Sequence, residues 1–356
     1  MKQIKSVLLF SVLLIMVSIG SVNMPGKQSP QIRKIKKIRT VRTAHGIKRL
    51  KVLKNRLIGP LLETKWGQRG EYARFAPPKK TGSNERFRLG CWSTALAQIL
   101  YYQRLKPFGT VRYITSRSCT DKKFCKIYQP LQDDDFDWKK FVDEIGRNTP
   151  ENKREEVARY CYYTAVVVEK DFGTGSYKLT HLKRANAVST HYNTIAHLYS
   201  TEENKDSLGE IKQIIHEEII NARPLMMHMR SVKVGEKRAW HAVVVDGAGY
   251  IGQRFIIHIN MGLMGRNNGW YDFDHIDKTY NDYNYRKIIT IKPLKRIRPI
   301  EKLLIKTPDK YSLGRGKVTY YFLTSRGGWE SRVGKTPRIL VSKLPRSLGE
   351  SALKSQ

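Results

Sequence analysis

The chain is poor in acidic residues and in long apolar runs, and each scarcity excludes a class of protein. It has 31 Asp and Glu against 66 Lys and Arg, a formal net charge of +35 over 356 residues. Its mean hydropathy is −0.50, and only one apolar stretch, at the N-terminus, approaches membrane length, which excludes a polytopic membrane protein. The 40% of apolar residues suffices for one or two hydrophobic cores, so wholesale disorder is also excluded.

The few cysteines do not form a metal motif. The sequence has four Cys, no C-x-x-C pair, no H-E-x-x-H segment and no dense group of His, Asp and Glu at ligand spacing. We therefore expect neither a metal nor an organic cofactor. Cys119 and Cys125 are close enough to close a small disulfide loop in an exported chain, whereas Cys91 and Cys161 have no near neighbour.

The N-terminus is typical of a secretory signal. Lys2 and Lys5 precede the apolar run VLLFSVLLIMVSIGSV, which gives a charged region followed by a hydrophobic region. We interpret residues 1–22 as a signal peptide, with no integral membrane domain after its removal, and we expect a secreted protein. The alternative is an uncleaved anchor, since the run is long and no clean A-x-A site follows it.

The positive charge is concentrated at the two ends of the chain. Residues 23–62 contain 12 Lys and Arg and no acid, and residues 292–356 contain 16 basic and 4 acidic residues. Such flanks can contact a polyanion such as nucleic acid, anionic lipid or acidic polysaccharide, or they can be solvated charge. The second interpretation is favoured, because no aromatic platform or nucleic-acid motif accompanies the N-terminal lysines.

A candidate nucleophile lies at the start of a predicted helix. In GCWSTALAQILYYQRLKP, apolar residues recur at helical spacing after Cys91, and Pro107 ends the element. The free backbone N–H groups and the dipole of a helix N-terminus favour a thiolate, so Cys91 is suited to nucleophilic attack near neutral pH. A buried structural cysteine is the alternative, and partners elsewhere in the chain must decide between the two.

A candidate base and its partner lie on a predicted hairpin. His241 begins the β-branched run HAVVV, which ends at the turn residues Asp246 and Gly247, and a second strand, RFIIHIN, ends at Asn260. The hairpin places His241 and Asn260 side by side, where the amide oxygen can orient the imidazole without adding charge. His258 faces the same side of its strand as Asn260, and we interpret it as a satisfied neighbour rather than as the base.

Taken together, four segments resemble the streptopain-like family of papain-fold cysteine peptidases in their order and spacing. The segments are LLETKWGQRGEYARFAP, GCWSTALAQILYY, WHAVVVDGAG and FIIHINMGLMGRNNGWYDFD, and the resemblance covers residues 61–293. It implies that Gln68 contributes to the oxyanion hole, that Cys91 is the nucleophile, and that His241 is the base oriented by Asn260. The implied fold is α+β, with a helical nucleophile lobe packed on an antiparallel sheet lobe.

Three features depart from the family pattern. Met261 stands where the family has a tryptophan that shields the Asn–His hydrogen bond, and Trp240 stands where a glycine precedes the histidine. Residues 23–58 are also shorter than the folded pro-region of the family's zymogens. These departures leave open a catalytically impaired papain-fold protein that binds a polyanionic or protein partner through its basic flanks.

The sequence thus predicts four parts in the chain. They are a signal peptide at 1–22, a basic leader or short propeptide at 23–58, a papain-like catalytic domain at 59–293 and a basic C-terminal extension at 294–356. The predicted activity is that of a secreted cysteine endopeptidase, made as a zymogen, that acts on proteins or peptides.

Overall fold

A computed structural model describes backbone and side chains over residues 57–116, 125–131, 136–235 and 238–294. Four further strands are described by their backbone: β1 (Ile35–Thr43), β2 (Gly46–Leu53), β11 (Lys317–Leu323) and β12 (Trp329–Lys335). The predicted signal peptide at 1–22 lies outside these residues. Within them, no helix combines the length and apolar character needed to cross a bilayer.

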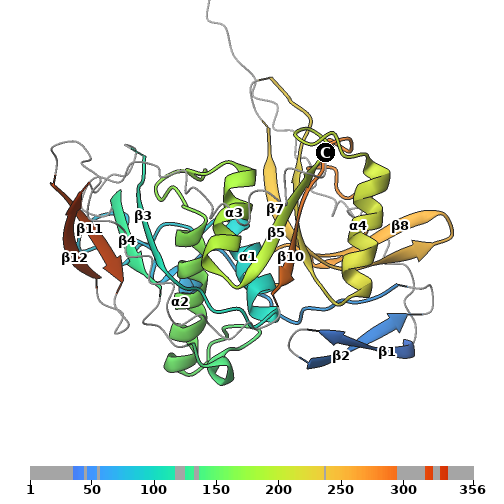
Figure 1. The fold of residues 1–356 in the computed structure, drawn as a ribbon, viewed down its shortest axis with the longest axis horizontal. Helices are drawn as coiled ribbons and strands as arrows, with labels where there is room; N and C mark the ends of the chain where they lie inside the picture. Colours follow the sequence, from blue (N-terminus) through green and yellow to red (C-terminus); the bar gives the residue numbers. More distant parts are fainter. Residues whose placement is uncertain are drawn as a thin grey trace, which may run out of the picture.

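A six-stranded antiparallel sheet forms the centre of the molecule (Figure 1). Its strand order is β5-β10-β6-β7-β8-β9. The bounds are Thr194–Ser200 for β5, Lys287–Pro293 for β10, Leu225–Arg230 for β6, Trp240–Ile251 for β7, Arg254–Asn260 for β8 and Gly269–Asp272 for β9. The β7–β8 pair is the predicted hairpin, and it sets Val244 opposite Asn260, but its turn lies at 252–253 and not at Asp246 and Gly247, which lie within β7 at a register shift.

Helices cover both faces of this sheet. Helices α1 (Cys91–Tyr102), α2 (Glu151–Val167) and α3 (His181–His191) lie on one side, and α4 (Leu208–Ile220) lies on the other (Figure 1). Together with the antiparallel sheet, they confirm the predicted α+β class.

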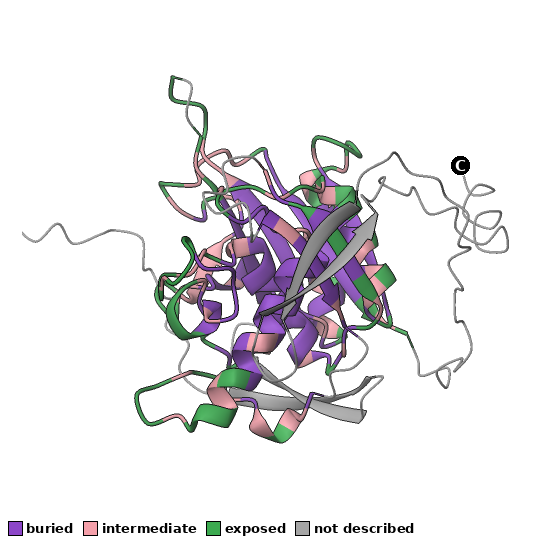
Figure 2. Ribbon diagram, turned by 90° about the vertical axis from the view of Figure 1, so that its left-hand side faces the viewer, coloured by how far each residue is buried: buried purple, intermediate pink, exposed green. Residues whose placement is uncertain are grey.

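The valine run of β7 is continuous because both faces of the strand are buried. Ala242 and Val244 belong to the core shared with α1 and α2, whereas Val243 and Val245 belong to the core under α4. A strand buried on both faces loses the usual alternation of apolar and polar residues. Each fully buried valine stabilises the fold by roughly 1.5–3 kcal/mol. Figure 2 shows the resulting layer of buried residues across the centre of the ribbon.

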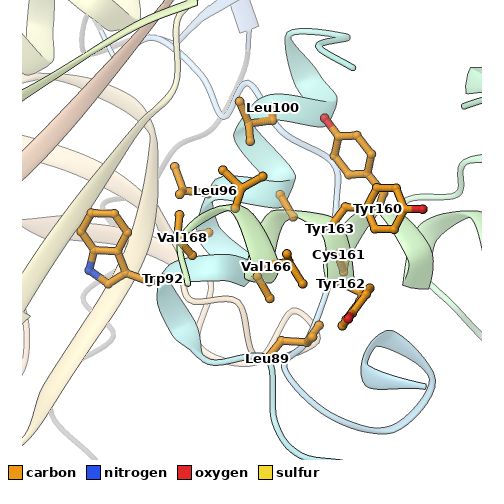
Figure 3. Packing of buried hydrophobic residues seen from close by; sticks show 14 of the residues in the cluster. Leu89, Trp92, Leu96, Leu100, Tyr160, Cys161, Tyr162, Tyr163, Val166 and Val168 are labelled. Carbon is orange, nitrogen blue, oxygen red and sulfur yellow. The ribbon is translucent and has the colours of Figure 1, made fainter. Parts of the chain in front are cut away.

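Helix α1, which carries the candidate nucleophile, is anchored by its packing against α2. Leu96 and Leu100 of α1 lie in one cluster with Tyr160 and Val166 of α2 (Figure 3). Cys161 also lies in this core as a free thiol, fully buried. This packing fixes the axis of α1, and therefore the position of its first residue, relative to the sheet.

A second sheet has the order β12-β11-β4-β3, where β3 spans Thr110–Ile114 and β4 spans Lys126–Pro130. Strand β11 pairs with β4 in parallel, so a strand from the predicted C-terminal extension joins a sheet of the predicted catalytic domain. Cys125, directly before β4, forms a disulfide, and its predicted partner Cys119 lies outside the described residues. Strands β1 and β2 form a separate antiparallel hairpin within the predicted leader.

Candidate active site

Cys91 is the first residue of α1, as the apolar spacing predicted. Gly90 precedes it with a φ of 89°, a left-handed conformation that favours glycine. A Cβ atom on Gly90 would lie 2.4 Å from the hydroxyl oxygen of Tyr177, so a larger residue would also clash. The same hydroxyl accepts a hydrogen bond from the backbone N–H of Ser93 at 3.2 Å, which satisfies one of the free donors of the first helical turn.

His241, the second residue of β7, forms a hydrogen bond with the Cys91 thiol. Its Nε2 lies 3.0 Å from the backbone carbonyl oxygen of Met261, which leaves Nδ1 for the sulfur. The imidazole is buried, with 7% of its residue surface exposed. Residues separated by 150 positions in sequence are thereby brought into direct contact.

The pKa values of the pair shift in opposite directions. Burial by itself raises the pKa of the Cys91 thiol, but the hydrogen bond and charge of His241, together with the backbone N–H groups of Ala242 and Trp92, bring it below its ordinary value. Burial lowers the pKa of His241, but the hydrogen bond and charge of Cys91 and the Met261 carbonyl raise it above its ordinary value. These shifts favour a thiolate–imidazolium pair, the form in which a cysteine is a strong nucleophile.

Asn260 lies at the end of β8, and its hydrogen bonds go to groups other than His241. Its Nδ2 donates to the Thr64 carbonyl at 2.6 Å and to Gln98 Oε1 at 3.1 Å. Its Oδ1 accepts from the backbone N–H of Gly262 at 3.0 Å. The acceptor that holds the imidazole is therefore the carbonyl of Met261, which lies between Asn260 and its hydrogen-bond partner Gly262.

Gln98 is a central site residue that the sequence did not single out. It is fully buried in α1, and its Oε1 accepts from Thr64 Oγ1 at 2.9 Å, from the backbone N–H of Trp66 at 3.3 Å and from Asn260. The side chain thus joins the nucleophile helix, the preceding loop and the end of β8. One signal was present in the sequence: a polar residue within the apolar stretch of STALAQIL.

Gln68 lies in the loop next to the start of α1. Its backbone carbonyl accepts from the N–H of Leu89 at 3.1 Å, and the Gly67 carbonyl accepts from Thr94 Oγ1 at 3.4 Å. Its side chain is half-buried and has no hydrogen-bond partner among the described residues. The loop therefore brings a free amide to the segment that carries Cys91.

His258 is engaged elsewhere, as the sequence analysis expected. Its Nδ1 lies 2.6 Å from Asp246 Oδ1, and Asp246 Oδ2 accepts from the backbone N–H of Leu62 at 3.1 Å. Asp246 is fully buried. The pair fixes the chain entering the domain against the β7–β8 hairpin.

The arrangement matches a known family. A model of the peptidase C10 family matches residues 66–271, which include Gln68, Cys91, His241 and Asn260. The chain belongs to the peptidase C10 family. This membership indicates a cysteine peptidase and confirms the resemblance to streptopain-like enzymes. No match was found among curated proteins.

Solved structures of a cysteine protease share the fold of this C10 family member. One is active wild-type interpain A of Prevotella intermedia, with a TM-score of 0.55 and 21% identity over 67% of this chain and 95% of that chain. Another is a fragment of prointerpain A from the same organism, with a TM-score of 0.52 and 20% identity over 67% of this chain and 72% of that chain. The papain-like fold predicted from the sequence is thereby confirmed.

The two side chains of this C10 family member that depart from the family pattern have distinct surroundings, and a third residue, Tyr280, covers the imidazole. Met261 is buried in the core under α4. Trp240 is 46% exposed and stacks on His228, with 5.4 Å between ring centroids and 13° between planes. Tyr280, which the sequence analysis did not single out, stacks on His241 at 5.6 Å and 18°. An aromatic ring from the loop after β9 therefore covers the imidazole in a site whose Asn is followed by methionine.

The described residues hold no group of three or more His, Cys, Asp and Glu side chains that could bind a metal ion.

Proposed function

We propose that the chain is an exported cysteine endopeptidase in which Cys91 is the nucleophile and His241 is the general acid and base. One observation carries this proposal: the Cys91–His241 hydrogen bond, with the thiol pKa lowered and the imidazole pKa raised. A buried structural cysteine has neither property. Cys161 in the same fold is such a cysteine, because burial alone raises its pKa.

In the proposed reaction, the Cys91 thiolate attacks the carbonyl carbon of a peptide bond. The side-chain amide of Gln68 and the backbone N–H of Cys91 donate hydrogen bonds to the resulting oxyanion. Protonated His241 gives its proton to the leaving amine, and a thioester with Cys91 remains. His241 then takes a proton from water as the water oxygen attacks the thioester, the C–S bond breaks, and the acid product leaves with the Cys91 thiolate and protonated His241 restored.

The proposed role of Asn260 in this reaction is to orient His241 indirectly. Its hydrogen bond to Gly262 and its pairing with Gln98 fix the turn that carries the Met261 carbonyl. That carbonyl accepts a hydrogen bond from the Nε2–H group of His241 and so keeps Nδ1 directed at the sulfur. Asn260 is accordingly a positioning residue in this scheme.

The decisive experiment is turnover of an unstructured protein or a fluorogenic peptide by the full chain in reducing buffer. We expect hydrolysis that Cys91→Ala abolishes and that the matched Cys161→Ala variant retains. Absence of hydrolysis, combined with slow alkylation of Cys91 at neutral pH, would contradict the proposal. A salt-dependent affinity for heparin or DNA without turnover would instead support the binding protein with basic flanks.

A further inference from the structure

Four aromatic rings form a continuous row beside the catalytic pair. The row runs from Trp92 through His181 and His228 to Trp240, with successive centroid distances of 5.5, 4.8 and 5.4 Å. Trp92 directly follows Cys91, and Trp240 directly precedes His241. One flank of the site is thus built from side chains whose backbone neighbours are the proposed nucleophile and base.

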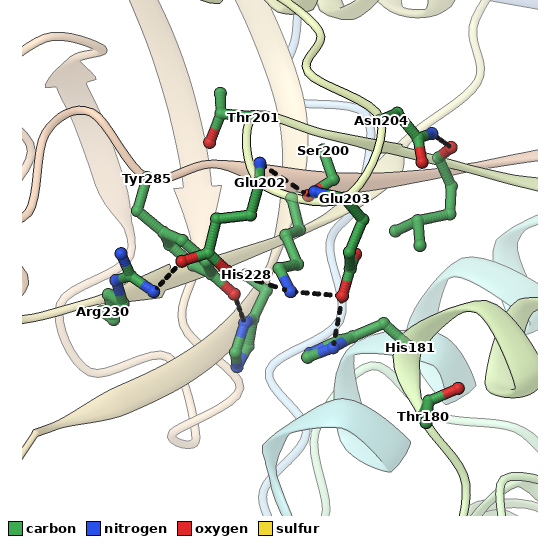
Figure 4. A network of polar contacts seen from close by, with 12 residues as sticks. Thr180, His181, Ser200, Thr201, Glu202, Glu203, Asn204, His228, Arg230 and Tyr285 are labelled. Atoms are coloured by element: carbon green, nitrogen blue, oxygen red, sulfur yellow. Dashed lines mark hydrogen bonds and ion pairs between the residues drawn. The ribbon is translucent and has the colours of Figure 1, made fainter.

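The carboxylates around this row already have cationic partners (Figure 4). Arg230 pairs with Glu202 and, at 2.5 Å, with Asp282. Lys287 pairs with Glu203 at 2.6 Å and with Glu202 at 3.5 Å. These pairs account for all three carboxylates.

Arg184 of α3 is left without a carboxylate partner among the described residues. Its guanidinium lies over the rings of Trp92 at 4.1 Å and Tyr177 at 4.7 Å, and its Nε donates to the Leu179 carbonyl at 3.1 Å. Burial lowers its pKa to about 10, so it stays protonated at neutral pH. The cation is therefore held in place without an ion pair to a carboxylate, and the charges of Cys91 and Glu203 act on it only from farther away.

The two terminal nitrogens of Arg184 remain available. Neither has a hydrogen-bond partner among the described residues, and neither belongs to the side-chain atoms that are sealed from solvent without a partner. Both therefore keep contact with solvent, although only 7% of the residue is exposed. A guanidinium presents these nitrogens as a planar fork that fits a carboxylate.

A second observation on the same row also points to a ligand with acceptor oxygens. The Nε1 of Trp92 is buried and has no hydrogen-bond partner, whereas the unpartnered Nε2 of His181 is an acceptor, since Nδ1 of the same ring faces Glu203 at 3.9 Å. The indole N–H is a donor only. Burial lowers the pKa of His181 to about 3, so this ring stays neutral and does not compete for an anion by its charge. One unused donor, the indole N–H of Trp92, and one cation without an ion-paired carboxylate thus share the flank of the site.

We infer that Arg184 is a specificity-determining residue that binds the carboxylate of an acidic side chain in the peptide substrate, with the Trp92–Trp240 row as its apolar wall. This inference rests on the proposed function, because it assigns a substrate class to the same site. It commits to Asp or Glu within the substrate chain. A free C-terminal carboxylate has the same chemistry and is separated from it by the test.

The test compares fluorogenic peptides that differ only by Glu or Gln at one position, scanned along both sides of the scissile bond and capped by a C-terminal amide. We expect kcat/KM to favour Glu by about tenfold or more at one position, as for a charge-assisted hydrogen bond. Arg184→Met should remove that preference, measured as the ratio of kcat/KM for the Glu and Gln peptides, and Arg184→Lys should retain part of it. A preference seen only when the C-terminus is a free carboxylate would overturn the assignment.

The matched control is Arg112→Met. Arg112 also lies over a tyrosine ring, at 4.6 Å from Tyr128, but it belongs to the second sheet. The Arg112→Met variant removes the same charge from the same kind of contact. It therefore measures the general attraction of acidic peptides to a chain of net charge +35. An equal loss of Glu preference in Arg112→Met and Arg184→Met would overturn the inference, as would an unchanged preference in Arg184→Met.

A binding measurement separates the inference from the proposed function. Fluorescence anisotropy of the same peptides is measured on Cys91→Ala, with and without Arg184→Met. If no peptide is hydrolysed but Glu peptides bind more tightly in an Arg184-dependent manner, the peptidase proposal fails and the acidic subsite stands. If hydrolysis occurs without any Glu preference in either measurement, the subsite fails and the peptidase proposal stands.

Discussion

The phenol ring of Tyr280 lies nearly parallel to the imidazole of His241, with 5.6 Å between centroids and 18° between planes. Tyr280 comes from the loop between β9 and β10, whereas His241 is the second residue of β7. The ring is half-buried, and the charge on Cys91 contributes to the rise of its phenol pKa, which burial dominates. Tyr280 thus limits the positions that the imidazole can adopt and reduces the access of water to the ion pair.

Removing this ring should weaken catalysis. We expect Tyr280→Ala to lower kcat/KM roughly fivefold, since a stacked aromatic pair is worth about 1 kcal/mol, and Tyr280→Phe to retain nearly full activity. Steady-state kinetics on one peptide measures the effect. Tyr283→Ala is the matched control, because Tyr283 lies on the same loop and packs against His275 at 5.0 Å instead. Equal losses in the two alanine variants would refute a role specific to His241.

The pH dependence of Cys91 alkylation should report the ion pair. Because the thiol pKa is lowered, iodoacetamide labelling should remain fast well below the ordinary thiol pKa of about 8.5. His241→Ala should move the acid limb of labelling upward, since burial is then opposed only by the backbone N–H groups of Ala242 and Trp92. His258→Ala should leave it unchanged, because that imidazole pairs with Asp246.

The pH profile of peptide turnover should have an acid limb and an alkaline limb. The active form needs an ionised thiol and a protonated imidazole, so the acid limb should lie below the ordinary thiol pKa and the alkaline limb above the ordinary imidazole pKa of about 6.5. In the alkylation experiment, mass spectrometry of the labelled peptides distinguishes Cys91 from the buried Cys161, which should stay unmodified. If the pH dependence of labelling were the same in wild type and in His241→Ala, the Cys91–His241 ion pair would be ruled out.

Gln68 should act on the transition state rather than on substrate binding. We expect Gln68→Ala to lower kcat by roughly 100-fold or more with little change in KM, as for the loss of one oxyanion donor. Thermal unfolding of the same variant should match wild type, since the side chain has no internal hydrogen-bond partner among the described residues. Arg69→Ala, at the exposed neighbouring position, serves as the control. A loss confined to KM would contradict the oxyanion role.

Gln98 should contribute to stability as well as to activity. Gln98→Ala leaves Thr64 Oγ1 and the Trp66 N–H without a buried partner and removes one hydrogen bond of the Asn260 amide. Each unsatisfied group costs about 1–3 kcal/mol, so we expect the free energy of unfolding in urea to fall by about 3 kcal/mol or more. Gln213→Ala removes an exposed amide contact to Glu217 in α4 and should change it by less than about 0.5 kcal/mol. Similar values for the two variants would show that the buried amide pair is unimportant.

Local sequence patterns predicted the elements that carry the site. The helical spacing after Cys91 and the β-branched run after His241 predicted where α1 and β7 begin, because both signals depend on residues close together in sequence. The family resemblance added Gln68, which no local pattern distinguishes from an exposed loop residue.

Contacts between residues far apart in the sequence could not be predicted from local sequence patterns. The acceptor for His241 was expected to be the Asn260 side chain, but the structure places the Met261 carbonyl there, and a backbone group leaves no mark in the sequence. Tyr280 reaches His241 through a loop whose course depends on the whole sheet edge. The pairing of β11 with β4 joins distant segments by backbone hydrogen bonds, which the sequence does not encode locally.

The amide pair of Gln98 and Asn260 has a consequence for the chain during its synthesis. The two residues are 162 positions apart, and the imidazole is held only after the strand that ends at Asn260 has joined the sheet. In a nascent chain that has not yet reached this strand, Cys91 is therefore an ordinary thiol, and it does not attack peptide bonds. Fragments that end before Asn260 should likewise have an unactivated Cys91, so the nucleophile forms only after translation has passed that residue.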